Sequence, residues 1–263
     1  MLNVCKNVAR KSFIQICAAG FLFLLAACTD YLPQVDAQIE EMREISNSSI
    51  NIPSIKFDPS TIVEGSMKDS RDGKTYRTLT IGTKIWMAEN LNYETANSFC
   101  YDNKSDNCAK YGRLYTWSAV MDSTGKWTEN GKGCGYGKLC SPPESVQGVC
   151  PTEWRIPLQG EWFNLFMSAG GSGKDGKYLK STSGWTSNNN GIDAFGFSAL
   201  PAGYRKSNGD FYGEGKYAYF WSSSEDSYDN ALGAYFYYRS DDVFPDPYNK
   251  SEAYSVRCIK DME

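Results

Sequence analysis

Cysteine content constrains the fold of this chain more than any other feature. The sequence of 263 residues has nine cysteines, and the last of them are Cys100, Cys108, Cys134, Cys140, Cys150 and Cys258. An even set of cysteines is typical of a disulfide framework in an exported domain, and of metal or catalytic sites in the cytoplasm. The N-terminus indicates which compartment applies.

Residues 1–27 have the composition of a secretory signal peptide. Basic residues near the start precede an apolar run from Phe13 to Ala27, which is too short to remain as a membrane span. Leu25-Ala26-Ala27-Cys28 resembles a bacterial lipobox, in which the cysteine is acylated and becomes the first mature residue. The alternative is an ordinary signal peptide with an incidental cysteine.

We therefore expect lipidation at Cys28 and an exported protein that is attached to a membrane through its N-terminal lipid. Thr29 stands where aspartate would favour retention in an inner membrane, so outer-membrane or cell-surface placement is expected in a Gram-negative cell. Residues 28–65 are polar and contain several prolines, which predicts a lipid anchor followed by a flexible tether.

Cys5 and Cys17 belong to the expected signal peptide, which leaves six cysteines for disulfides. Six cysteines allow 15 pairings, and the sequence alone does not choose among them. We favour Cys100–Cys108 and Cys134–Cys140, which close short loops, together with Cys150–Cys258, which ties the middle of the domain to its last strand. The long loop would stabilise the fold by about 4–5 kcal/mol in the chain-entropy model, against about 2–3 kcal/mol for each short one. A metal site is disfavoured because no paired C-x-x-C pattern is present.

The chain has no histidine, which excludes Ser-His-Asp and Cys-His catalysis and zinc sites that need imidazole. A net charge of −4 without a basic patch makes nucleic acid an improbable partner. Carboxylate chemistry remains open, and Glu153 with Glu161 is the candidate acid/base pair. The competing interpretation is that Glu161 caps a helix and Glu153 is solvated. For Glu89 we favour a hydrogen bond within a turn over ligand binding.

Periodicity predicts an α+β domain over residues 66–261. We expect strands at 75–81 and 84–90 joined by a Gly82-Thr83 turn, helices at 114–121 and 158–169, and closing strands at 217–222, 234–239 and 253–259. Residues 170–215 read as a long irregular insert rich in Gly, Ser, Asn and Asp.

Several motifs in a fixed order then resemble a known family. They are 67–76, 81–93, 108–117, 148–157, 193–205, 220–225 and 255–258. Together they resemble the Fibrobacter succinogenes major paralogous domain family, whose members look like surface or secreted proteins, often lipoproteins, without an established activity. The resemblance implies a disulfide-stabilised, C-type-lectin-like domain with two helices, short antiparallel strands and long loops. Cys150–Cys258 would match that fold's bridge from a helix to the final strand. The lectin sequence pattern for calcium-dependent sugar binding is absent, so the resemblance in fold says little about function.

Two ligand hypotheses follow from the loops. No cofactor is expected, although acidic side chains in the later loops offer the oxygen ligands that calcium prefers, namely Asp226, Asp229, Asp241, Asp242 and Asp246. The alternative is solvated loop charge.

Aromatic side chains are the second hypothesis, because exposed rings on loops present rigid contact area to sugars. The candidates lie in or near Gly/Asn-rich stretches and are Trp127, Trp185, Tyr204, Tyr212 and Tyr217, with 185–217 as the preferred face. The tryptophans expected in the core are Trp86, Trp117, Trp154, Trp162 and Trp221. We expect a non-catalytic, lipid-anchored surface domain that binds extracellular polysaccharide. The alternatives are a structural or assembly module that binds another envelope protein, and a carboxylate-based enzyme.

Overall fold

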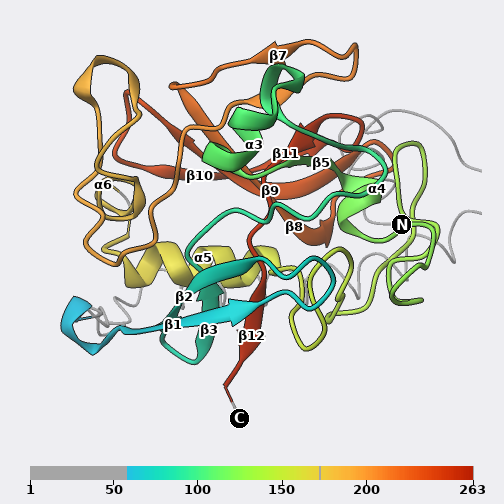
Figure 1. The fold of residues 1–263 in the computed structure, drawn as a ribbon, viewed down its shortest axis with the longest axis horizontal. Coiled ribbons are helices and arrows are strands. Elements are labelled where there is room, and N and C mark those ends of the chain that lie inside the picture. The colour runs from blue at the N-terminus through green and yellow to red at the C-terminus, as the bar shows by residue number, and fades with distance from the viewer. Residues whose placement is uncertain (1–57, 172, 263) are drawn as a thin grey trace, which may run out of the picture. The chain divides into compact units, whose positions relative to one another are not determined.

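The computed structural model describes residues 58–171 and 173–262 (Figure 1). The expected signal peptide, Cys28 and the tether as far as residue 57 lie outside the described residues. Three antiparallel sheets and several short helices form the described domain, which is therefore of the α+β class. No helix in this described part of the chain is long and apolar enough to cross a bilayer.

The first sheet joins the two ends of the domain. Its strands run in the order β1 (Val63–Lys68), β2 (Thr75–Ile81), β3 (Lys84–Met87) and β12 (Ile259–Asp261). The predicted hairpin between β2 and β3 is confirmed, and Gly82 has the positive φ of 64° that the first position of a type II′ turn requires. β1 begins slightly before the expected boundary at residue 66, because its first residues already pair with β2.

The second sheet has the order β10 (Val243–Asn249), β9 (Asn230–Tyr237) and β8 (Tyr217–Glu225). The third sheet is built from very short strands. Its order is β4 (Ser98–Phe99), β5 (Leu114–Thr116), β11 (Ala253–Tyr254), β6 (Tyr204–Arg205) and β7 (Phe211–Tyr212).

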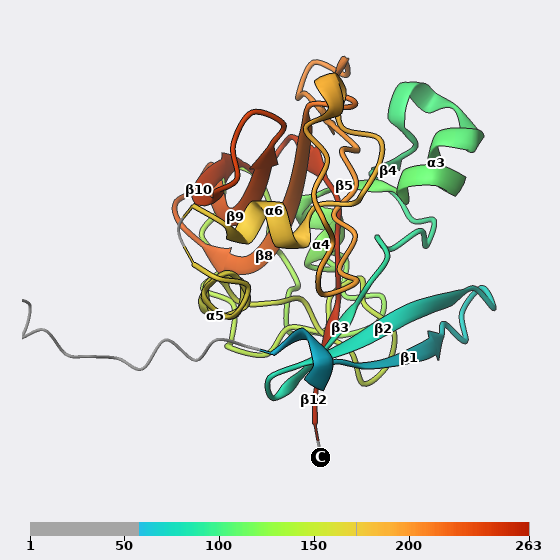
Figure 2. The same ribbon diagram turned by 90° about the vertical axis from the view of Figure 1, so that its left-hand side faces the viewer.

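Helix α5 (Gln159–Ser168) lies between the first and second sheets, as Figures 1 and 2 both show. Its Trp162 is fully buried in one cluster with Trp86 of β3 and Phe220 of β8, so the helix joins the two sheets through one core. The helix starts as expected, with a Glu161 carboxylate oxygen accepting a hydrogen bond from the Leu158 backbone N–H at 2.9 Å. All of the tryptophans expected in the core are buried, namely Trp86, Trp117, Trp154, Trp162 and Trp221.

Two predicted elements are wrong in part. The expected helix over 114–121 is instead the strand β5 followed by the one-turn helix α4 (Trp117–Val120), because Leu114–Thr116 pairs with β4 and β11. The expected strand over 253–259 is split into β11 and β12, which belong to different sheets. Helical spacing and strand length are local signals, and pairing with distant segments overrides them.

The described residues also contain more helix than the two helices expected. The additional α-helices are α3 (Ser105–Tyr111) and α6 (Asp175–Leu179), and three one-turn 3-10 helices cover Pro59–Thr61, Tyr101–Asn103 and Thr186–Asn188. The region 170–215, expected to be irregular, thus contains α6, a 3-10 helix and the strands β6 and β7. Smaller differences concern strand ends, since β3 stops at Met87 rather than residue 90 and β9 covers 230–237 rather than 234–239.

Three disulfides fasten the domain: Cys100–Cys108, Cys134–Cys140 and Cys150–Cys258. This is the pairing favoured from the sequence. The third bridge spans 108 residues and joins the loop before α5 to the segment that leads into β12, so it closes the second half of the domain into one ring.

Candidate functional site

Tyrosine side chains from all of the strands β6 to β11 meet on one side of the second sheet. We call this group the tyrosine cluster, and its members are Tyr204, Tyr212, Tyr217, Tyr219, Tyr235, Tyr237, Tyr248 and Tyr254. Tyr212 is 46% exposed, Tyr254 is buried, and the others are half-buried. The cluster therefore forms a continuous aromatic surface that is partly open to solvent.

Strand register explains how the cluster forms. Tyr217 and Tyr219 of β8 stand directly opposite Tyr237 and Tyr235 of β9, and alternate residues of a strand share one face. The opposed rings stack with centroids 5.2 Å apart for Tyr217–Tyr237 and 5.4 Å apart for Tyr219–Tyr235. Gly233 has no side chain, so the ring of Tyr248 lies close to its backbone and reaches Tyr219.

The stacking determines what the cluster can offer a ligand. Rings that stack cover one another's faces, so a ligand meets mainly ring edges and phenolic hydroxyls. Burial raises the pKa of Tyr204, Tyr217 and Tyr235, so these phenols stay protonated at neutral pH. The Tyr248 hydroxyl oxygen is buried and has no hydrogen-bond partner among the described residues, which leaves a polar group to be satisfied at the cluster.

The structure separates the sequence-predicted aromatic residues into two groups. Tyr204, Tyr212 and Tyr217 come together in the cluster, with ring centroids 5.9 Å apart for Tyr204–Tyr212 and 6.3 Å apart for Tyr212–Tyr217. Trp185 does not join them. It is only 4% exposed, and its indole N–H donates to the Ser181 hydroxyl and the Ala199 carbonyl.

Trp185 is therefore a core residue, and its expected role as a sugar-stacking ring is wrong. Trp127 lies apart from the cluster as well. Its ring packs edge-on to Tyr93 with centroids 5.6 Å apart and beneath the Arg71 guanidinium at 5.3 Å.

The carboxylates do not form the acid/base pair considered from the sequence. Glu161 accepts hydrogen bonds from both Arg155 terminal nitrogens, while Glu153 pairs with Lys260 at 3.0 Å. Burial opposes ionisation of Glu161, but the Arg155 hydrogen bond and charge outweigh it and lower the pKa of its carboxyl. A carboxyl group that acts as a general acid at neutral pH needs a raised pKa, so Glu161 is unsuited to that role. Glu89 accepts a hydrogen bond from the Arg77 backbone N–H at 2.6 Å, across the β2–β3 hairpin and not within a turn.

The acidic loop residues considered as calcium ligands do not gather into a cluster in the described part of the chain. Within residues 58–171 and 173–262, no group of three or more acidic or cysteine side chains is placed to hold a metal ion. Asp242 instead accepts a hydrogen bond from the Gly173 backbone N–H.

These features define a disulfide-stabilised α+β domain with a tyrosine-rich surface. Residues 79–260 match the family model of the Fibrobacter succinogenes major domain, and the chain belongs to this family. No curated protein and no solved structure matches the chain.

Sequence reasoning missed most of the cluster. Tyr219, Tyr235 and Tyr237 had a readable signal, because Tyr-x-Tyr spacing places both rings of a strand on one face. Tyr248 and Tyr254 had no such signal, since each reaches the cluster through strand pairing that the sequence does not reveal.

Proposed function

We propose that the chain is a non-catalytic, lipid-anchored surface domain that binds a neutral extracellular polysaccharide on the tyrosine cluster. The observation that carries this proposal is the row of stacked rings, of which Tyr212 is 46% exposed and the others, except the buried Tyr254, are half-buried. Sugars present both C–H groups and hydroxyls, and this surface supplies apolar edges and neutral phenols that donate and accept hydrogen bonds. Charges of both signs border the cluster, since the Lys206 ammonium lies 4.8 Å from the Tyr212 ring centroid and the Tyr254 hydroxyl donates to Glu252. This mixture favours neither an anionic nor a cationic polymer, so we propose a neutral one.

The same proposal includes a cellular address and a finer fold class. The lipobox-like segment before Cys28 supports export, lipidation and outer-membrane placement. The long Cys150–Cys258 bridge from the segment before a helix to the segment before the last strand supports a C-type-lectin-like arrangement. Both are proposals, and mass spectrometry of the N-terminal peptide from native cells tests the lipid directly.

Polysaccharide pull-down tests the binding function. Purified, oxidised protein is incubated with insoluble cellulose, chitin and xylan, and soluble glycans are screened on an array. Tyr212→Ala removes an exposed ring of the cluster, and we expect about tenfold weaker binding. The free energy of unfolding should fall by no more than about 0.5–1.5 kcal/mol, the amount that its ring contacts with Tyr204 and Tyr217 contribute. Tyr228→Ala is the matched control, because Tyr228 is 61% exposed and lies outside the cluster.

Two outcomes would overturn the proposal. The first is that wild-type protein retains none of these polymers. The second is that Tyr212→Ala and Tyr228→Ala bind as wild type does. Capture of an envelope protein in place of a glycan would favour the alternative of an assembly module.

A further inference from the structure

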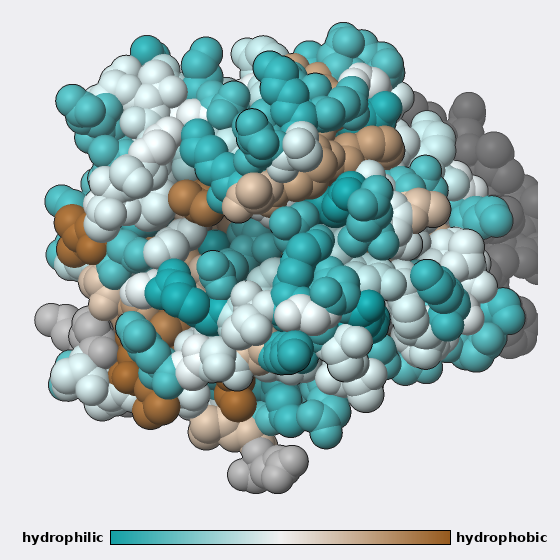
Figure 3. Space-filling model, in the orientation of Figure 1, coloured by the Kyte–Doolittle hydropathy of each residue, from teal (hydrophilic) through white to brown (hydrophobic). Residues whose placement is uncertain are grey.

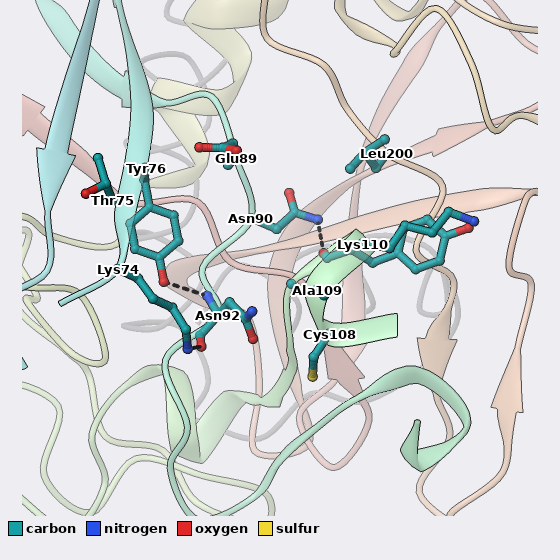
Figure 4. Close-up of a pocket in the computed structure, with 12 residues that line it drawn as sticks. Lys74, Thr75, Tyr76, Glu89, Asn90, Asn92, Cys108, Ala109, Lys110 and Leu200 are labelled. Atoms are coloured by element: carbon teal, nitrogen blue, oxygen red, sulfur yellow. Dashed lines mark hydrogen bonds between the residues drawn. The ribbon is translucent and has the colours of Figure 1, made fainter. Parts of the chain in front are cut away.

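A second feature lies away from the stacked rings. A cavity of about 240 Å³ opens between β2 and α3, with Leu200 on one side. Figure 3 shows a hydrophilic hollow near the centre of the face that Figure 1 presents, and Figure 4 shows the side chains that surround the cavity. Cavities that hold drug-sized ligands usually measure about 300–1,000 Å³, so this one fits a single small ring.

The wall of the cavity is held rigidly. The Asn90 amide nitrogen donates to the Tyr111 carbonyl at 2.8 Å, and the Asn90 amide oxygen accepts from the buried Arg257 guanidinium at 2.9 Å. Gly112 allows α3 to approach this close, because a Cβ there would lie 2.7 Å from the Cβ of Asn90. The Cys100–Cys108 disulfide ties α3 to the end of β4, and Cys108 itself lines the cavity. Because the wall is already ordered, binding of a ligand does not carry the entropic cost of ordering it.

Polar groups with unused hydrogen-bonding capacity face this rigid wall. The side-chain amide of Asn92 and the hydroxyl of Thr75 have no hydrogen-bond partner in the described part of the chain, and both line the cavity. Glu89 uses one carboxylate oxygen for the Arg77 N–H, so its other oxygen can accept. The Asn92 amide can donate to one hydroxyl and the Glu89 carboxylate can accept from another, since both residues line the cavity and a hydroxyl can both donate and accept.

The charges around the cavity favour a neutral ligand. Lys74 and Lys110 border it, but Lys74 pairs with Asp72 at 3.0 Å and Lys110 with Glu214 at 3.7 Å. Among the described residues, the Glu89 carboxylate forms no salt bridge, and the cation that acts on it is the buried Arg257 guanidinium. An anionic ligand would meet the Glu89 carboxylate, whereas the rim lysines already have acidic partners.

We propose that this cavity binds a single neutral sugar unit, with Asn92 and Glu89 each bonded to one of its hydroxyls and Leu200 against the sugar's C–H face. The inference extends the proposed function, because a chain end held here is next to the polymer surface. Glu214 connects the cavity to the tyrosine cluster. Its carboxylate accepts a hydrogen bond from the hydroxyl of Tyr111, which lines the cavity, at 2.8 Å, and it lies between Tyr212 and Tyr217 in the chain.

Titration followed by two-dimensional amide NMR tests the inference separately from polymer binding. The probes are D-glucose, D-galactose, N-acetyl-D-glucosamine and D-glucuronate, each added to about 100 mM. We expect at least one neutral sugar to give saturable shifts at residues 89–92 and 108–112, and glucuronate to bind more weakly than that sugar. Asn92→Ala should weaken binding at least about tenfold with an unchanged melting temperature, because its side-chain amide makes no hydrogen bond within the described part of the chain.

Matched variants make the result decisive. Asn208→Ala, at an exposed turn, should bind sugar as wild type does. Tyr212→Ala should also keep the sugar shifts, so loss of polymer binding alone would leave this inference standing. The inference is overturned if no neutral sugar shifts these residues, if glucuronate binds at least as tightly, or if Asn92→Ala binds as wild type does.

Discussion

Tyr217 and Tyr237 occupy directly opposed positions of β8 and β9, and their rings stack with an interplanar angle of 17°. The pair lies at the open end of the tyrosine cluster, where Tyr212 stacks on the other side of Tyr217. Strand register, and not the turn that joins the strands, therefore sets the spacing of the rings that we propose as the polymer surface.

A double-mutant cycle measures this pair directly. We expect Tyr217→Ala and Tyr237→Ala to show a coupling free energy of about 0.5–1.5 kcal/mol in urea unfolding, because stacked aromatic pairs contribute that much beyond area burial. Tyr217→Ala combined with Tyr228→Ala is the control and should be additive. If the changes in unfolding free energy of Tyr217→Ala and Tyr237→Ala are additive as well, the two rings do not stabilise each other and the prediction is wrong.

Removing the long disulfide should destabilise the domain far more than removing a short one. Cys150→Ala with Cys258→Ala opens a loop of 108 residues, and Cys134→Ala with Cys140→Ala opens one of 6. In the chain-entropy model the losses are about 4–5 kcal/mol and about 2–3 kcal/mol. Chemical unfolding under non-reducing conditions gives both values, and equal losses would show that the chain-entropy account fails here.

Lys250 should act as a structural cation. Its fully buried ammonium donates to the Glu225 carboxylate at 2.7 Å and to the carbonyls of Lys138 and Ser227 at 2.9 and 2.6 Å. Lys250→Met leaves the Glu225 carboxylate without its cation, and we expect a loss of about 3–5 kcal/mol.

The exposed pair Lys132–Glu129 provides the control for Lys250. Lys132→Met should change the free energy of unfolding by less than about 0.5 kcal/mol, because exposed ion pairs contribute little. Thermal or urea unfolding gives the free energy of unfolding of both variants. If Lys250→Met loses as little as Lys132→Met does, the Lys250 network does not stabilise the fold.

The buried carboxyl of Asp175 should make stability depend on pH. Burial raises its pKa from 3.8 to about 6, and its Oδ1 has no hydrogen-bond partner among the described residues. Between these two pKa values the folded chain binds more protons than the unfolded chain, so this group's contribution to the unfolding free energy rises as pH falls through 6 and levels off below 3.8.

Asp175→Asn isolates that contribution from the other titrating groups. The gain in stability of Asp175→Asn over wild type should be larger at about pH 7.5 than at about pH 4.5, by on the order of 2–3 kcal/mol. Asp226→Asn, at an exposed position, is the control. If the gain from Asp175→Asn is the same at both pH values, burial does not raise the pKa of Asp175 in the protein.

Local signals in the sequence determined several elements of the fold. The Gly82-Thr83 turn, helix α5 and the buried tryptophans were all predicted, because glycine conformation and apolar periodicity act over a few residues. The favoured disulfide pairing was one of 15 that the sequence allowed. The family was recognisable from motifs whose spacing is fixed along the chain.

Tertiary structure decided which distant segments meet. Leu114–Thr116 has helical spacing but forms a strand, because β4 and β11 supply hydrogen-bond partners. Trp185 follows a glycine-rich stretch but is buried, because its indole N–H finds Ser181 and Ala199 inside the domain. The residues next to Leu114–Thr116 and to Trp185 do not predict either outcome.

Both proposed sites depend on the same kind of long-range contact. The tyrosine cluster needs the register of β8, β9 and β10, and the sugar cavity needs β2, the segment 89–92 and α3 in one place. Composition showed that the chain is rich in tyrosine, with 18 of them. Only strand pairing and the close approach at Gly112 bring those side chains together, because contacts between distant residues depend on the free energy of the whole fold.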